Sequence, residues 1–180
     1  MKIAFAQVDA FADRPFTGNP AGVMRLDTWL DDALLQAIAA ENNLPETAFV
    51  VPTTGDAEYE LRWFTPNAEV ALCGHATLAS GHVVLGNDMP VGKGHVRFRT
   101  RQAGVLTVAR KGDAYDLSLP AWAPSLKPLP AIVAALGVEQ RVLLELGPGE
   151  VDHEREGEPA RCEAHLPAAR IERGSGKLGQ

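Results

Sequence analysis

The sequence predicts an α+β domain in which an antiparallel sheet or barrel is wrapped around a central helix of small residues. First, residues 74–85 are helix-forming but apolar or small on nearly every side, which is typical of a buried helix. Second, several segments alternate apolar and polar side chains with the two-residue period of strands. Third, short turns containing glycine join the segments between residues 96 and 119, as in an antiparallel meander. Strands packed around one buried helix satisfy all three observations.

The N-terminal third predicts two strands followed by an amphipathic helix. Residues 3–11 alternate in part and suit a first strand, and residues 21–24 suit a short second one. The motif Thr28-Trp29-Leu30-Asp31 resembles a capping box, so we expect a helix from there to about Asn43. Pro45 disfavours helical geometry at the residue before it and helps to end that helix. Its expected apolar stripe consists of Leu30, Leu34, Ala37 and Ile38.

The remaining elements follow from the same patterns. The helix that opens at Gly74 ends at about Leu85, because Gly86-Asn87 is a good stop signal. A further short helix is predicted near the end of the regular pattern. In chain order, the predicted strands are residues 47–51, 58–64, 96–101, 105–110 and 115–119, and the further helix is residues 129–136.

Composition excludes several classes of function. The 180-residue chain carries a net charge of −6 and has no Lys/Arg cluster, which argues against nonspecific binding of nucleic acid. Its start does not resemble a signal peptide, and its longest apolar runs are far too short to span a membrane. Cys73 and Cys162 form no recognisable disulfide framework. We therefore expect a soluble cytoplasmic protein without nucleic-acid or membrane partners.

The composition changes near the C-terminus. Every aromatic residue lies between Phe5 and Trp122, and residues 147–180 lack a periodic apolar pattern. Such a segment buries too little surface to offset its ordering entropy. We expect the folded part to end near residue 146, and residues 147–180 to be a disordered or non-native tail.

The start of the buried helix is the leading candidate for a ligand site. A helix N-terminus offers unpaired N–H groups and a partial positive charge, which together favour a carboxylate or phosphate. Gly74 has no Cβ to keep a ligand away, and His75 adds an imidazole to the first turn. From these residues alone, a core histidine satisfied by the backbone remains the alternative for His75. Cys73 is more simply a small buried hydrophobe.

Four motifs in order and spacing resemble the PhzF-like phenazine biosynthesis proteins, which are isomerases with a fold similar to diaminopimelate epimerase. The similarity extends over about residues 3–122. The motifs are Asp9-Ala10-Phe11, Phe16-Thr17-Gly18-Asn19-Pro20-Ala21, Asn43-Leu44-Pro45-Glu46-Thr47-Ala48-Phe49 and Leu72-Cys73-Gly74-His75-Ala76-Thr77.

The resemblance implies two similar lobes with the active site between them. Residues 123–180 lack the second lobe's Gly-Ser-Ala-His-like motif. We therefore expect residues 1–146 to be the N-terminal lobe only, with the second lobe missing. Loss of that lobe would impair activity. A shifted reading frame is one possible source of the tail. A lobe built to face another leaves an apolar wall exposed, which favours self-association such as a homodimer.

The resemblance also assigns roles to individual residues. Glu46 lies in apolar company that would raise a carboxyl pKa, although an exposed glutamate at a strand start is the plain alternative. In the family the matching glutamate transfers the proton. The resemblance implies that His75 helps to bind substrate and that the turn containing Asn19 lies near the pocket, and the helix-start argument adds Gly74 to the substrate-binding residues. It implies no cofactor, and Cys73, His75 and His82 lack the spacing of a structural zinc site, so no metal site is expected.

Three functions remain open. The first is a cofactor-independent isomerase that moves a proton on a small carboxylate-bearing substrate, with Glu46 as the acid/base. The second is a catalytically silent half-protein that only binds or dimerises. The third is an amino-acid epimerase or racemase that uses Cys73 as its base, as related epimerases do with a cysteine at this kind of position.

Overall fold

The computed structural model describes residues 2–14, 16–87 and 92–120, together with three two-residue strands at 125–126, 144–145 and 171–172. Residues 1–119 and 161–180 form one unit, and residues 120–160 form a second. The helix expected at 129–136 lies outside the described residues. So does the expected tail at 147–180, apart from the strand at 171–172.

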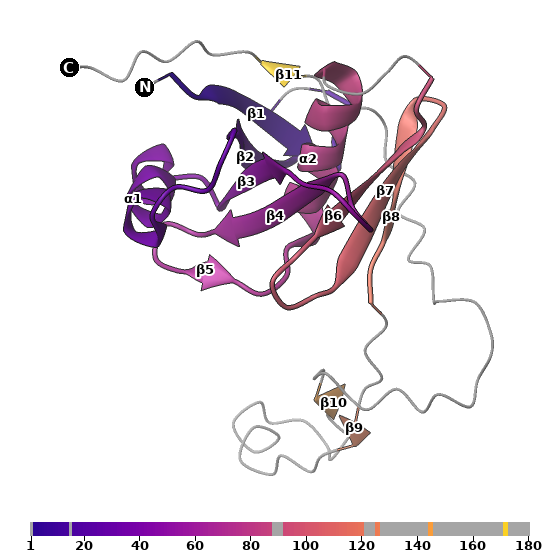
Figure 1. The fold of residues 1–180 in the computed structure, drawn as a ribbon. Coiled ribbons are helices and arrows are strands. Elements are labelled where there is room, and N and C mark those ends of the chain that lie inside the picture. The colour runs from indigo at the N-terminus through magenta and orange to yellow at the C-terminus, as the bar shows by residue number, and fades with distance from the viewer. Residues whose placement is uncertain are drawn as a thin grey trace. The chain divides into compact units, whose positions relative to one another are not determined.

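A curled mixed sheet is the main feature of the first unit (Figure 1). Its strand order is β11-β1-β2-β3-β4-β6-β7-β8, and β5 pairs with β4 at the side. A separate two-stranded sheet is formed by β9 and β10. The strands are β1 (Ala4–Ala10), β2 (Asn19–Arg25), β3 (Glu46–Pro52), β4 (Tyr59–Phe64), β5 (Glu69–Val70), β6 (His95–Arg99), β7 (Val105–Lys111), β8 (Ala114–Ser118), β9 (Ser125–Leu126), β10 (Leu144–Glu145) and β11 (Ile171–Glu172).

The α+β class is confirmed, and two strand pairs refine it. The pairs β2–β3 and β4–β6 are parallel, whereas the other ladders are antiparallel. The helix α1 (Asp32–Asn42) connects β2 to β3, and β5 together with the helix α2 (Gly74–Asn87) connects β4 to β6. A helical crossover returns the chain to the same end of the sheet, so the next strand must run parallel to the first.

The sheet separates two apolar cores. On one face, Ala48 and Val50 of β3 pack in the cluster that contains α2. On the other face, Phe49 and Val51 pack in the cluster that contains α1. Because both faces of β3 are covered, the strand is buried at nearly every position rather than at every second one.

Helix α2 is the small-residue helix expected from the sequence, and it lies against the curled sheet (Figure 1). A Cβ added to Gly81 would lie 2.4 Å from Cγ1 of Val108 on β7. The missing side chain at Gly81 therefore sets how closely α2 approaches the sheet.

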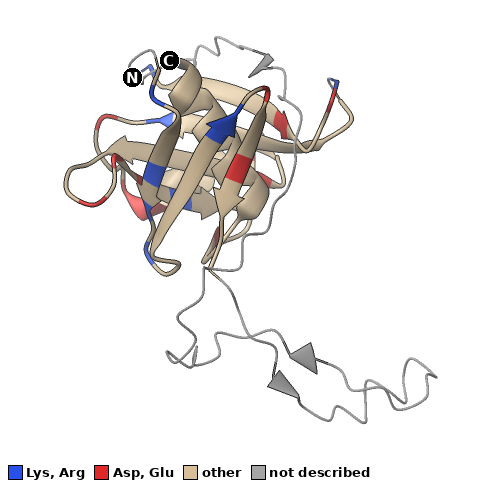
Figure 2. Ribbon diagram, turned by 90° about the vertical axis from the view of Figure 1, so that its right-hand side faces the viewer, with Lys and Arg blue, Asp and Glu red and all other residues tan. Residues whose placement is uncertain are grey.

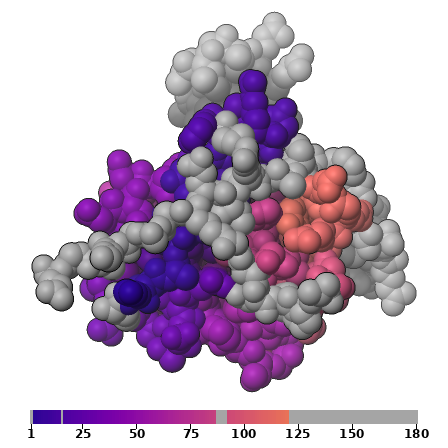
Figure 3. All heavy atoms as spheres, turned by 90° about the horizontal axis from the view of Figure 1, so that it is seen from above, coloured from indigo at the N-terminus to yellow at the C-terminus, as the bar shows by residue number. Residues whose placement is uncertain are grey.

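Seen from above, residues of the first strands and of β7 and β8 lie on the same face of the molecule (Figure 3).

The prediction for α1 was wrong in its start and only partly right in its apolar stripe, because Leu30 and Ile38 do pack against the core that contains Leu35 and Ala39. The helix begins at Asp32 after the N-cap Asp31, which makes no side-chain capping bond, so Thr28 does not open it. The fully buried positions of α1 are Leu35 and Ala39, which the prediction did not include, whereas the predicted Leu34 is 45% exposed. The end agrees better, because Asn43 follows in the left-handed conformation that often ends a helix.

The surface carries charges of both signs, interspersed on the face shown in Figure 2. Among the described helices, none has the length and apolar character needed to cross a membrane.

Candidate active site

Three side chains from two distant segments meet at one end of α2. Glu46 is the first residue of β3, Cys73 immediately precedes α2, and His75 lies in the helix's first turn. The parallel register between β2 and β3 places Ala21 opposite Glu46, so Pro20 lies next to the site. The β2–α1–β3 crossover therefore brings Glu46 to the helix start, although the sequence separates them widely.

Glu46 and His75 face each other without forming a hydrogen bond. Glu46 Oε2 lies 3.1 Å from His75 Nε2, and the side chains are 20% and 10% exposed, respectively. Both atoms are buried and have no hydrogen-bond partner among the described residues, so their orientation does not make a hydrogen bond. A buried polar pair without a hydrogen bond is costly to a structure and is typical of a group kept for chemistry.

The neutral imidazole is the dominant form of His75. Burial lowers the pKa of His75, while the nearby Glu46 charge and a hydrogen bond to the Pro20 carbonyl oppose that effect. Nδ1 lies 3.4 Å from the Cys73 sulfur, and the Pro20 carbonyl offers the ring a further acceptor, whereas Nε2 has no hydrogen-bond partner among the described residues; we therefore assign the proton to Nδ1. Nε2 then presents its lone pair toward Glu46.

Cys73 is a buried, protonated thiol that caps the helix. Burial raises its pKa to about 11, although the backbone N–H groups of Ala76 and His75 act in the opposite direction. Those N–H groups lie in the first turn, where Ser, Thr or Asp usually supplies the capping acceptor. The sulfur lies 3.4 Å from His75 Nδ1. The prediction that Cys73 is a small buried residue is confirmed, and the structure adds its contact with His75.

The other predicted site residues lie close by in sequence but differ in environment. A Cβ added to Gly74 would lie 3.8 Å from Leu119 Cδ1, its nearest neighbour, so steric packing within the described residues does not require glycine there. Asn19 is exposed at the start of β2. Gly18 is required by the turn itself, since a Cβ would lie 2.3 Å from the carbonyl oxygen of Ala10. That turn delivers the Pro20 carbonyl, a partner of His75 that sequence reasoning missed.

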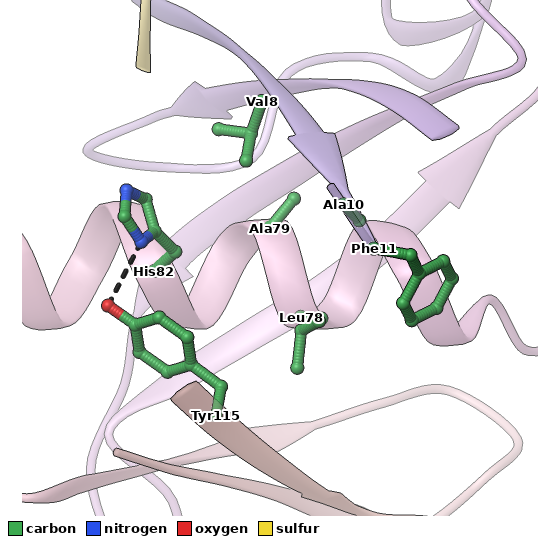
Figure 4. A pocket seen from close by; sticks show the side chains of 7 residues that line it. All are labelled: Val8, Ala10, Phe11, Leu78, Ala79, His82 and Tyr115. Atoms are coloured by element: carbon green, nitrogen blue, oxygen red, sulfur yellow. Dashed lines mark hydrogen bonds between the residues drawn. The ribbon is translucent and has the colours of Figure 1, made fainter. Parts of the chain in front are cut away.

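A separate pocket lies between β1, α2 and β8 (Figure 4). His82 Nδ1 lies 2.9 Å from the Tyr115 hydroxyl, which accepts a hydrogen bond from Arg110. Burial, followed by the Arg110 charge, lowers the pKa of His82. The polar groups of the pocket therefore have hydrogen-bond partners in one another, which agrees with the expected structural role of His82. The lining residues are Val8, Ala10, Phe11, Leu78, Ala79, His82 and Tyr115.

Comparisons with known proteins converge on one family. Residues 8–130 match the family described as phenazine biosynthesis-like protein, PhzC-PhzF. An uncharacterised isomerase of Pseudomonas aeruginosa is 52% identical over 149 residues, which cover 81% of this chain and 55% of that protein.

Solved structures agree. A putative phenazine biosynthesis PhzC/PhzF protein from Clostridium difficile is 44% identical with a TM-score of 0.65, covering 79% of this chain and 54% of that one. A PhzF family protein from Enterococcus faecalis is 46% identical with a TM-score of 0.63, covering 77% and 52%, respectively. The chain thus spans about half the length of the relatives that it matches.

Proposed function

The chain belongs to the phenazine biosynthesis-like PhzC-PhzF family, and we propose that it acts as an isomerase in which Glu46 moves a proton on a small carboxylate-bearing substrate. The isomerase class rests on the family and on its isomerase-named relatives. The residue assignment and the substrate class are our proposal.

One observation carries the assignment of Glu46. Its Oε2 lies 3.1 Å from His75 Nε2, yet neither atom has a hydrogen-bond partner among the described residues. With the His75 proton on Nδ1, two acceptor atoms face each other across the site. A proton removed from substrate carbon by Glu46 would let the new carboxylic acid donate to Nε2. The pair is therefore ready to hold one additional proton, as a general acid/base requires.

The substrate's acid group is assigned to the start of α2. Gly74 opens the helix, and its packing leaves room beside the backbone. The helix dipole favours an anion at this end. We propose that Gly74 and His75 bind the acid group and that Asn19, on the neighbouring turn, contributes to the rim. Every step in this scheme uses protein groups, and no cofactor enters it.

The chemistry of Cys73 argues against the cysteine-based epimerase. A thiol with a pKa near 11 is almost entirely protonated at neutral pH, so it is a poor base. Its sulfur also accepts from the first-turn N–H groups, which gives the residue a role in shaping the helix start. The catalytically silent alternative makes a simpler prediction, because no substitution would then alter proton exchange.

Solvent-deuterium incorporation into candidate cyclic acids and amino acids tests the proposal with this chain itself. Glu46→Gln should lower the exchange rate by about 10²–10⁴-fold, because the amide keeps the size but cannot accept the proton. His75→Ala should mainly raise the substrate concentration needed for half-maximal exchange. Cys73→Ala should remain active. Glu41→Gln, an exposed glutamate on α1, is the matched control and should behave as the unsubstituted chain does.

Two outcomes would contradict the assignment. Loss of exchange in Cys73→Ala with retention in Glu46→Gln would identify an epimerase-like cysteine site. Exchange equal to a buffer blank in every variant, and in the unsubstituted chain, would support the silent alternative.

A further inference from the structure

We propose that Glu46, Cys73 and His75 form a zinc-binding site, and that Zn²⁺ bound there reversibly blocks proton transfer. The metal site stands on the geometry of the three side chains. The inhibitory consequence rests on the function proposed above.

The three donor groups are already close enough to converge on one ion. One ligand atom from each residue lies within 4.8 Å of the other two. Neighbouring ligand atoms in a tetrahedral zinc site are about 3.3–3.6 Å apart, as metal–ligand bonds of about 2.0–2.3 Å require. The 3.1 Å separation of Glu46 Oε2 and His75 Nε2 is near that range. Binding then requires the Cys73 sulfur, which lies 3.4 Å from Nδ1, to turn toward the Nε2 side of the ring.

The kinds of donor select the metal. A thiolate, an imidazole and a carboxylate together suit zinc, whereas magnesium and calcium prefer sites made of oxygen donors. Three protein ligands leave a fourth position open for water. The site resembles accessible zinc centres more than closed structural ones.

A second observation points independently to a bound cation. The His75 side chain is only 10% exposed. Its Nε2 and the facing Glu46 Oε2 both lack hydrogen-bond partners among the described residues. The His75 ring hydrogen-bonds the Pro20 carbonyl, which is the kind of second contact that orients zinc-ligating histidines. A cation between Nε2 and Oε2 would satisfy both atoms at once.

Sequence spacing did not indicate this site, because its ligands come from two separate elements. The sequence brought Cys73, His75 and His82 under consideration. In the structure His82 is held by Tyr115, at 2.9 Å, in the separate pocket. Glu46 from the start of β3 takes the third position instead.

The chemistry of binding also explains the inhibition. Cys73 must release its thiol proton to solvent as the Zn–S bond forms, so each bound ion releases one proton from this residue. Glu46 coordinated to zinc no longer offers the lone pair that would accept the substrate's proton. Zinc should therefore inhibit exchange at stoichiometric amounts.

Cobalt substitution tests the site directly. Added to the metal-free, reduced protein, Co²⁺ should give intense visible bands of a tetrahedral site and a near-ultraviolet charge-transfer band from thiolate to metal. Zn²⁺ should displace the Co²⁺ and remove both features. Mg²⁺ should displace nothing.

Variants identify the ligands. Cys73→Ala should abolish the charge-transfer band and weaken Zn²⁺ binding by more than about 100-fold, the upper end of the losses caused by removing a second-shell partner alone. Cys73→Ser, which keeps a capping acceptor, should also lose the band, and it guards against misfolding of the alanine variant. Glu46→Gln should weaken Zn²⁺ binding at least tenfold. Cys162→Ala and His95→Ala are the controls and should bind as the unsubstituted chain does.

The results separate the two proposals. A Co²⁺ complex without the charge-transfer band, a band that disappears in Cys162→Ala, or Zn²⁺ affinity unchanged by both Cys73 variants would overturn the metal site. Exchange is measured in parallel with chelator present. A site that binds zinc in a chain that exchanges no proton even with chelator would overturn the proposed function and leave the metal site standing.

Discussion

Two polar clusters of this molecule differ in how completely their hydrogen bonds are satisfied. The first, the arginine cluster, consists of Arg62 with Asp32 and Glu69. The second, the Glu46 site, consists of Glu46, Cys73 and His75. Both clusters join a helix to the sheet and both are partly buried. Their difference motivates our proposal that the arginine cluster holds the fold together and that the Glu46 site receives a ligand.

Each nitrogen of the Arg62 guanidinium donates a hydrogen bond to a carboxylate. The side chain is only 4% exposed, and its Nε and Nη2 donate to the two Glu69 oxygens at 2.8 Å each. Its Nη1 donates to Asp32 at 2.8 Å, and its guanidinium also stacks on the rings of Trp29 and Phe64. The fork geometry of arginine suits such a two-oxygen contact. This cluster fastens α1 and β5 to β4.

The Glu46 site lacks such a complete set of hydrogen bonds among the described residues. Of the four buried side-chain atoms without hydrogen-bond partners in the described residues, Glu46 Oε2 and His75 Nε2 face each other, while the other two belong to Trp63 and Arg97. A pair of this kind is destabilising unless something binds to it. The arginine cluster is thus satisfied by its own hydrogen bonds, whereas the Glu46 site keeps two buried polar atoms without one, and our proposals assign the second cluster to function.

Removal of the central arginine should have the largest effect on stability. Arg62→Met keeps most of the packing volume but removes the buried partner of Glu69 and leaves it only the exposed Arg101, so we expect a loss of about 3 kcal/mol in the free energy of unfolding. Arg101→Met is the control. Arg101 touches the same carboxylates but is 53% exposed, so its loss should be within about 1 kcal/mol. Equal losses in the two variants, measured by denaturant unfolding, would show that burial does not govern this cluster.

Two glycine substitutions in α2 should separate the clusters, because a displaced α2 disturbs the Glu46 site but not the arginine cluster. Gly81→Ala forces a methyl group against Val108 and should destabilise by about 1–3 kcal/mol. Because α2 carries His75, the His75 ring resonances should shift more than those of Arg62. Gly86→Ala meets no atom within 4 Å and should instead stabilise by up to about 1 kcal/mol, since alanine favours helix. Stabilisation by both substitutions would contradict the close contact between α2 and β7.

The pH dependence of stability should separate the clusters with smaller effects. Burial lowers the pKa of His75 and of His82, so unfolding takes up protons and stability falls as the pH drops below about 6.5, levelling off below the folded pKa values. Arg62 lowers the pKa of Glu69, so its contribution is lost only as the pH drops further, below about 4.3.

His75→Gln should therefore flatten the upper part of this profile, and Arg62→Met the lower part. His95→Gln, an exposed histidine on β6, serves as the control and should keep the profile of the unsubstituted chain. Unfolding titrations across the two ranges check both expectations. A His75→Gln profile that matches the unsubstituted chain above pH 5 would contradict the buried neutral form of His75.

Local sequence patterns predicted the parts of the fold that depend on local rules. The small-residue composition of α2 marks it as buried, and glycines at 104 and 112 mark turns whose positive φ values the structure shows. The start of α1 was missed because Thr28 carries the right capping chemistry but does not take the capping role. Asp31 takes the N-cap position without a side-chain bond, and propensity alone cannot distinguish these cases.

The site was predictable only in part, for a related reason. The family resemblance pointed to Glu46, His75 and Asn19, and the chemistry of a helix start pointed to Gly74. Their relative placement depends on the parallel register of β2 and β3, which no local pattern determines. The placement of the Pro20 carbonyl beside His75 likewise arises from tertiary structure, whereas the contact of Cys73 with His75 is local to the helix start. The roles of Gly74 and Asn19 in substrate binding stay predictions.

The most direct test of the contrast between the clusters compares two glutamate-to-glutamine changes by equilibrium unfolding at pH 7. Glu69→Gln breaks a charge-assisted pair with a buried arginine and should lose about 2 kcal/mol. Glu46 Oε2 has no hydrogen-bond partner among the described residues, so in Glu46→Gln the free energy of unfolding should be unchanged or higher. A loss in Glu46→Gln as large as that in Glu69→Gln would contradict the account, because Glu46 would then support the fold rather than stand ready for a ligand.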